Sequence, residues 1–182
     1  AGLTAMNETM LKKDFDTEAN ELGSAAPRKA VDLVLEEAKR CGASASEAAA
    51  SISQGLSLTV RMGEIETVEH TRDRDLAVTV YFGKRTGSAS TSDYSATSVQ
   101  QTVRAACSIA RFTEEDRCHG LADPNRLATE FPDLDLYHPW RFTVDEGKEL
   151  ARECEQAALD HDPRIENSEG ATVDSYQGCE VY

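Results

Sequence analysis

Hydrophobic and polar residues alternate along the chain between residues 46 and 92, with the period of two that is typical of strands. Apolar side chains occupy every second position in two runs, Leu56–Leu58–Val60–Met62 and Leu76–Val78–Val80–Phe82. Weaker runs cover residues 46–53 and 64–71, and a stretch of small residues covers 87–92. Gly63 and Gly83 separate neighbouring runs, so the pattern predicts strands joined by short turns.

Three segments have the spacing of amphipathic helices, and each begins with a residue suited to that place. Pro27 begins a helix that Gly42 ends, Ser95 is an N-cap, and Thr143 with Glu146 forms a capping box before a helix over 143–160. A further short helix is predicted over residues 7–22. The predicted buried stripes are Val31, Val34, Leu35 and Ala38; then Val99, Val103, Ala106 and Ala110; then Gly147, Leu150, Cys154, Ala157 and Ala158.

The order of these elements predicts an α+β fold, because the strands are clustered between two helices rather than alternating with them. We expect an antiparallel meander sheet packed by two helices, then a capped helix and the start of a second sheet. Residues 165–173 and 178–181 would form the hairpin that begins this second sheet. The predicted organisation is a polar extension over 1–26, an α+β domain over 27–112, and a linker with the beginning of a further domain over 113–182.

Acidic residues dominate the composition, with 33 Asp and Glu against 19 Lys and Arg and a formal charge of −14. Such a charge repels phosphate backbones, so nucleic-acid binding is disfavoured. The five cysteines are widely and irregularly spaced, which favours a reduced, cytoplasmic chain over a disulfide framework. No apolar run approaches the ~20 residues that a membrane span requires, so we expect no membrane contact.

The residues that could carry catalysis are scattered. The four histidines are His70, His119, His138 and His161, and none has another histidine within five positions. Cys118 beside His119 is the only pair suggestive of a metal site, and Asp133 with Asp135 is expected to face solvent. The sequence therefore predicts no catalytic, cofactor-binding or metal-binding residue in this chain.

The stretch of small residues is the remaining candidate for binding. A strand without side-chain bulk lets another backbone approach closely, and enzymes that process unfolded peptides commonly pair them with an exposed sheet edge. The candidate contacts with a peptide or partner are Gly87, Ser88, Ala89, Ser90, Thr91 and Ser92. The alternative is a strand covered by the helices of its own chain, and both interpretations stay open.

Three stretches of the chain resemble the PmbA (TldE) branch of the TldD/PmbA metallopeptidase family. They are MGEIETVEHTRDRDLAVTVYFGKRTGSASTSDYS, then CHGLADPNRL with PDLDLYHPW, then DPRIENSEGATVDSYQGCEVY. Together they extend the resemblance from residue 27 to residue 182, where family members continue for a long C-terminal region. Members of the family are sometimes labelled modulators of DNA gyrase.

The resemblance implies a cytoplasmic, heteromeric protease in which a TldD-like subunit carries a His-Glu-x-x-x-His motif and holds a zinc-type metal. This chain would contribute the chamber and the subunit interface for unfolded peptides rather than the metal site. The alternative class is a non-enzymatic protein-interaction module.

The charge of the chain leads to a first prediction. Duplex DNA should not bind at physiological salt, because the phosphate contribution that dominates non-specific affinity is repulsive here. Fluorescence polarisation of a labelled duplex measures this directly. Saturable binding that weakens steeply with added salt would contradict the prediction.

Overall fold

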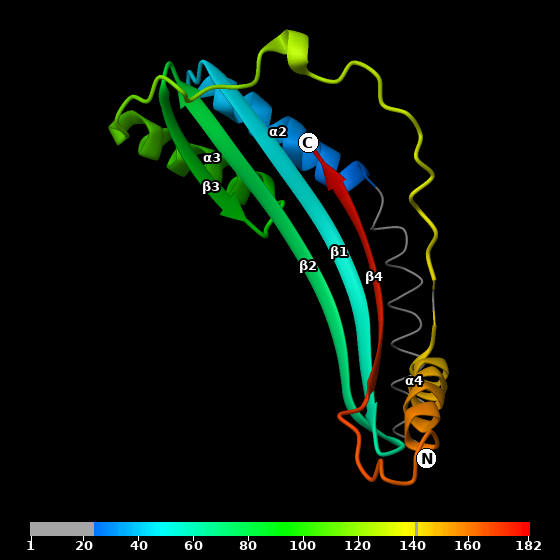
Figure 1. Ribbon diagram of the computed structural model, residues 1–182. Coiled ribbons are helices and arrows are strands. Elements are labelled where there is room, and N and C mark those ends of the chain that lie inside the picture. The colour runs from blue at the N-terminus through cyan, green and yellow to red at the C-terminus, as the bar shows by residue number, and fades with distance from the viewer. Residues whose placement is uncertain (1–23, 141) are drawn as a thin grey trace. The chain divides into compact units, whose positions relative to one another are not determined.

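The computed structural model describes residues 24–140 and 142–182 (Figure 1). In this part of the chain, one four-stranded sheet in the order β3-β2-β1-β4 is accompanied by helices. The helix predicted over 7–22 lies outside the described residues. The elements are α2 (Ala25–Arg40), β1 (Ala45–Arg61), β2 (Glu64–Phe82), β3 (Arg85–Thr91), α3 (Ala96–Phe112), the short 3₁₀ helix η1 (Pro124–Arg126), α4 (Val144–Leu159) and β4 (Ala171–Val181).

The α+β class is confirmed, with an antiparallel sheet, two helices flanking its first three strands, and a later capped helix. The strands are longer than the sequence pattern predicts, because the runs before and after Gly55 form the single strand β1. A Cβ atom at Gly55 would lie 2.9 Å from Thr71 Oγ1 and 3.2 Å from the Ser175 carbonyl oxygen. This glycine therefore permits close approach within the sheet and does not turn the chain.

The prediction of a hairpin that starts a second sheet is wrong. Residues 171–181 form one continuous strand, β4, which joins the same sheet as β1. Gly178, the predicted start of a separate strand, lies within β4 and does not interrupt it. Gly170, with φ +97°, stands immediately before β4, and a Cβ there would lie 2.7 Å from the Val60 carbonyl oxygen.

The described chain divides into two compact units, which we treat separately. Unit 1 contains the described residues of 1–52, 73–130 and 178–182, and unit 2 contains residues 53–72 and 131–177. This division follows spatial contacts and allows one strand to contribute to both units. The boundaries expected from sequence, at 26/27 and 112/113, stay a prediction.

Unit 1 has the larger apolar core. Its buried side chains come from α2, α3 and the adjoining strands, and include Val34, Leu76, Val78, Val80, Val99 and Val103. The predicted stripe of α3 is confirmed, because Val99, Val103, Ala106 and Ala110 are all fully buried. The stripe of α2 is confirmed except at Leu35, which is 39% exposed.

An ion pair between a buried carboxylate and an exposed arginine links the two helices of unit 1. The carboxylate of Glu37, on α2, is only 4% exposed, and its Oε1 accepts from Arg104 Nε on α3 at 3.1 Å. Its Oε2 accepts from Arg40 at the same distance. A buried carboxylate is costly unless it is paired, so both arginines are needed to keep Glu37 in this position.

Unit 2 packs α4 against strands. The predicted capping box is present: Thr143 Oγ1 accepts from the Glu146 amide at 3.2 Å, and Glu146 Oε2 accepts from the Thr143 amide at 2.7 Å. The predicted packing face is confirmed at Gly147 and wrong elsewhere, since Leu150, Cys154, Ala157 and Ala158 are exposed. The other buried residues of α4 are Ala151 and Glu155, and Ala151 packs with Leu58 and Val60 of β1.

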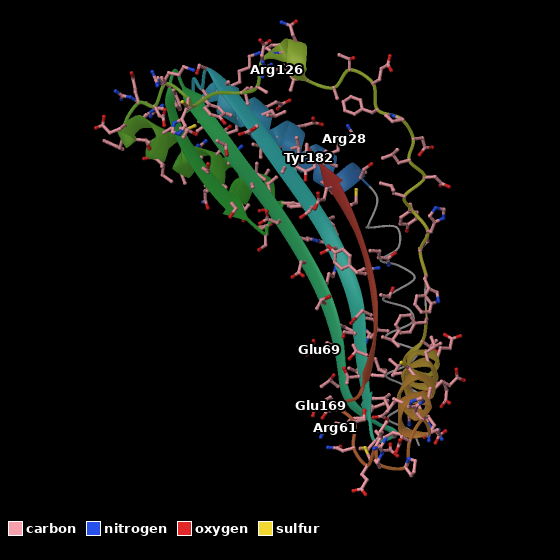
Figure 2. The ribbon with its side chains drawn as sticks, in the orientation of Figure 1. Arg28, Arg61, Glu69, Arg126, Glu169 and Tyr182 are labelled. Carbon is pink, nitrogen blue, oxygen red and sulfur yellow. The ribbon has the colours of Figure 1, made fainter. Side chains whose placement is uncertain are left out.

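Glu155 explains this shift of the buried face. Met62 and Gly63 connect β1 to β2 with φ values of 51° and 79°, the left-handed conformation of a two-residue hairpin loop. Their amides donate to the two carboxylate oxygens of Glu155, each at 2.8 Å. Arg61, labelled at this end of β1 in Figure 2, donates from Nε to the Ser168 carbonyl oxygen at 3.0 Å.

The hydrogen bonds from the Gly63 and Met62 amides lower the pKa of Glu155 below its ordinary value of 4.5. A carboxyl group with a lowered folded-state pKa stabilises the fold above its unfolded-state pKa, and this stabilisation disappears as the pH falls through the folded-state value. We therefore expect Glu155→Gln to lower the Tm near neutral pH. The Tm difference from the parent should narrow as the pH falls below 4.5.

Differential scanning fluorimetry between pH 7 and about pH 3 measures this difference, since the carboxylates of folded proteins titrate in that range. Glu153→Gln, a neighbouring exposed change on α4, is the matched control. A Tm difference for Glu155→Gln that is independent of pH would show that the carboxylate charge does not stabilise the hairpin.

Candidate functional site

The small-residue strand β3 lies at an edge of the described sheet. It pairs antiparallel with β2, with Gly87 opposite Val80 and Ala89 opposite Val78. Gly87 is buried against α3, where a Cβ atom would overlap the Ala106 carbonyl oxygen and lie 2.5 Å from the Ala110 nitrogen. The absence of a side chain at Gly87 thus permits close packing of the chain's own helix.

The six predicted contact residues do not form one surface. Gly87 is buried and Ala89 packs against the core of unit 1, whereas Ser88, Ser90 and Ser92 are exposed. Ser88 Oγ lies 2.9 Å from Thr79 Oγ1 on β2, and Thr91 Oγ1 lies 3.0 Å from Ser98 Oγ on α3. The helix α3 accounts for the low bulk at Gly87, and contact with a partner at the exposed serines stays a prediction.

The residues considered as metal ligands or as an acid–base pair do not gather into a metal site. Within residues 24–140 and 142–182, no group of three or more His, Cys, Asp and Glu side chains is arranged to hold a metal ion. Cys118 is exposed, and its amide donates to Asp116 Oδ1 at 2.8 Å, which lowers the pKa of that carboxyl. Asp133 and Asp135 are both exposed, as predicted, and Asp133 Oδ1 accepts from the Asp135 amide at 3.0 Å.

The buried cysteine Cys107 lacks the surroundings of a nucleophile. Cys107 is buried, and burial together with a hydrogen bond to Cys41 raises the pKa of its thiol to about 11. A thiol with such a pKa is protonated near neutral pH and therefore unreactive. Cys154 was expected among the buried residues of its helix but is exposed.

Two tyrosines form polar contacts that sequence reasoning missed. Tyr81 donates to Glu47 Oε1 at 2.7 Å, which raises the pKa of its phenol to about 12. Tyr94 donates to the carbonyl oxygens of Ser51 and Asp75, at 2.6 and 2.9 Å. Both phenols therefore serve as hydrogen-bond donors that link neighbouring segments of unit 1.

A groove in unit 2 was also missed. It has a volume of about 510 Å³ and runs between α4 and the segment that precedes it. Trp140 and Phe142 form one wall, with ring centroids 4.8 Å apart and planes inclined at 41°. The α4 side is formed mainly by Asp145, Glu149, Leu150 and Glu153. The sequence signal was present in the aromatic residues before the capping box, but nothing in the spacing placed them against the helix.

The comparisons with known proteins agree with this fold. Residues 46–110 match the family described as PmbA/TldA metallopeptidase domain 1. The chain is 47% identical over 155 residues to a metalloprotease PmbA homolog of Haemophilus influenzae, and 46% identical over 150 residues to metalloprotease PmbA of Escherichia coli O157:H7. These alignments cover 85% and 82% of this chain, but only 34% and 33% of the relatives. The chain thus spans about a third of their length.

Solved structures share the fold. A modulator of DNA gyrase from Bacteroides thetaiotaomicron superposes with a TM-score of 0.68 at 24% identity, over 84% of this chain and 34% of that one. TldE from Thermococcus kodakarensis superposes with a TM-score of 0.59 at 16% identity, over 83% of this chain and 37% of that one.

These similarities define a class, the PmbA/TldD metallopeptidase family, whose first domain residues 46–110 match. Within that family, the chain is a PmbA/TldE-like N-terminal region. Among the described residues, no helix combines the length and apolar character needed to cross a membrane.

Substitutions on the buried and the exposed face of β3 should have different effects on stability. Gly87→Ala should destabilise the chain by about 1–3 kcal/mol, because the added methyl group meets the α3 backbone. Ser90→Tyr, on the exposed face, should change stability by less than ~0.5 kcal/mol. Urea unfolding of both variants measures the two effects. A destabilised Ser90→Tyr variant would show that this face is packed within the chain and is not available to a partner.

Proposed function

We propose that this chain is the N-terminal part of a PmbA/TldE-like subunit of a heteromeric metallopeptidase that acts on unfolded peptides. It contributes the chamber and the subunit interface, and a TldD-like partner holds the zinc-type metal. The assembly would work in the cytoplasm. The observation that carries this proposal is the similarity to metalloprotease PmbA, which extends over more than four-fifths of the chain.

The exposed apolar residues of unit 2 support an interface role. Phe131, Leu136 and Tyr137, in the extended segment before α4, are 83%, 82% and 58% exposed. Apolar side chains gathered in one exposed segment are typical of a surface that another polypeptide covers. Metal-dependent chemistry by the described residues themselves has no support, since they provide no group of metal ligands.

The proposal predicts that the isolated chain binds no stoichiometric zinc and cleaves no peptide. Among residues 24–140 and 142–182 there is no group of metal ligands that could polarise an amide carbonyl. Elemental analysis and cleavage of an unfolded fluorogenic peptide measure the two properties. Stoichiometric zinc that is lost in Cys118→Ala or His119→Ala, or chelator-sensitive cleavage, would contradict the proposal.

The partner is tested by mixing the chain with a purified TldD-like protein that contains the metal motif. Size-exclusion chromatography with light scattering should show a complex, and Ser90→Tyr should weaken that complex if the exposed face of β3 lies at the interface. A stable complex without peptidase activity would instead favour the non-enzymatic interaction module.

A further inference from the structure

We propose that the groove beside α4 binds the basic side chains of an extended peptide. This inference deepens the proposed function, on which it rests, by naming lysine- or arginine-bearing segments as the peptide class that unit 2 recognises. The groove is lined by Trp140, Phe142, Asp145, Glu146, Glu149, Leu150 and Glu153.

The aromatic wall of the groove is fixed in place by contacts within unit 2. Phe142 lies directly over Gly147 of α4, where a Cβ atom would be 2.6 Å from the phenyl ring. Ser175 Oγ, on β4, donates to the carbonyl oxygen of Trp140 at 3.1 Å. The Trp140 side chain nevertheless remains 56% exposed, so its ring is available to a ligand.

The acidic side of the groove carries three negatively charged side chains on one face of α4. Asp145, Glu149 and Glu153 recur at intervals of four residues and therefore lie on one face of α4. Like charges at this spacing destabilise a helix, so a bound cation would relieve a repulsion that is built into α4. Glu146, by contrast, is engaged in the capping box.

The basic residues of α4 leave most of this charge uncompensated. Lys148 lies 3.9 Å from Glu64 of β2, and Arg152 lies 3.9 Å from Glu149 with both side chains more than half exposed. An exposed pair at that distance is weak, so a cationic ligand can compete with Arg152 for Glu149. Within the described part of the chain, neither Asp145 nor Glu153 has an ion pair or hydrogen bond through its carboxylate.

The chemistry of the groove favours an organic cation. The carboxylates of Asp145, Glu149 and Glu153 do not converge on a point that would hold a metal ion. Aromatic faces attract Lys and Arg head groups, and the apolar stems of these residues can pack along Leu150. The volume of about 510 Å³ lies within the ~300–1,000 Å³ of small-molecule sites, which is enough for one or two long side chains.

Trp140 is the only tryptophan of the chain, so its fluorescence reports directly on the groove. The probe is an end-blocked peptide of alternating glycine and lysine. The controls are the same peptide with glutamate, or with norleucine, in place of lysine. We expect a saturable change in Trp140 emission with the lysine peptide alone, and we expect the apparent affinity to fall as salt is added.

Matched variants locate the binding. The double variant Glu149→Gln and Glu153→Gln should weaken binding of the lysine peptide about fivefold to tenfold, in line with the loss of two partly screened charge contacts. Glu36→Gln, at an exposed glutamate of α2, should leave binding unchanged. Circular dichroism melts confirm that each variant is folded, since all three positions are exposed.

The inference is overturned if the lysine peptide gives no saturable change, if norleucine or glutamate peptides bind equally well, or if Glu36→Gln weakens binding as much as the double variant. The experiments distinguish a failure of the groove proposal from a failure of the proposed function. Peptidase activity in a complex with a TldD-like protein, without a Trp140 response, rejects the groove alone. A Trp140 response without complex formation or proteolysis supports the groove and rejects the proposed function.

Discussion

The packing of unit 2 depends on one carboxylate. Glu155, on α4, accepts hydrogen bonds from both amides of the Met62–Gly63 turn, and it is almost fully buried there. A two-residue loop in the left-handed conformation turns its amides outward, where they need acceptors. By supplying these acceptors, Glu155 fixes the rotation of α4. Ala151 then packs against β1 and Gly147 lies beneath Phe142, while Leu150 and the acidic side chains of Asp145, Glu149 and Glu153 are exposed. The orientation of the helix therefore follows from hydrogen bonding as much as from apolar burial.

Local signals in the sequence predicted local structure well. The capping box at Thr143 and the N-cap at Ser95 both form, and the periodic stripe of α3 is buried throughout. These features depend on residues within a few positions of one another, so their spacing is sufficient evidence. The α+β class follows from the same signals, because the order of elements limits how the sheet can be covered.

The predictions that were wrong concern residues whose contacts lie far away in the sequence. Leu150 is more hydrophobic than Glu155, yet Leu150 is exposed and Glu155 is buried, because the partners of Glu155 are amides more than 90 positions earlier in the chain. Separate strand runs were predicted on the two sides of Gly55, but this glycine lies within one strand and closely approaches Ser175, which is equally remote in sequence. The groove was missed for a related reason, since one of its walls includes Phe142, which lies over Gly147 of α4. Predicting it required the three-dimensional position of an aromatic ring and not the period of a pattern.

The length of β1 limits which insertions and deletions the chain can tolerate. β1 has 17 residues and contributes Ala50 and Ile52 to unit 1 and Leu58 and Val60 to unit 2 without an intervening loop. Side chains alternate between faces with a period of exactly two, so a single inserted or deleted residue near Gly55 would invert the face of everything on one side of it. Loops ordinarily absorb such length changes, whereas this strand offers no such tolerance. The number of residues between Ile52 and Leu58 thus determines which side chains of β1 are buried in both units. Only insertions or deletions of an even number of residues would keep the same side chains buried.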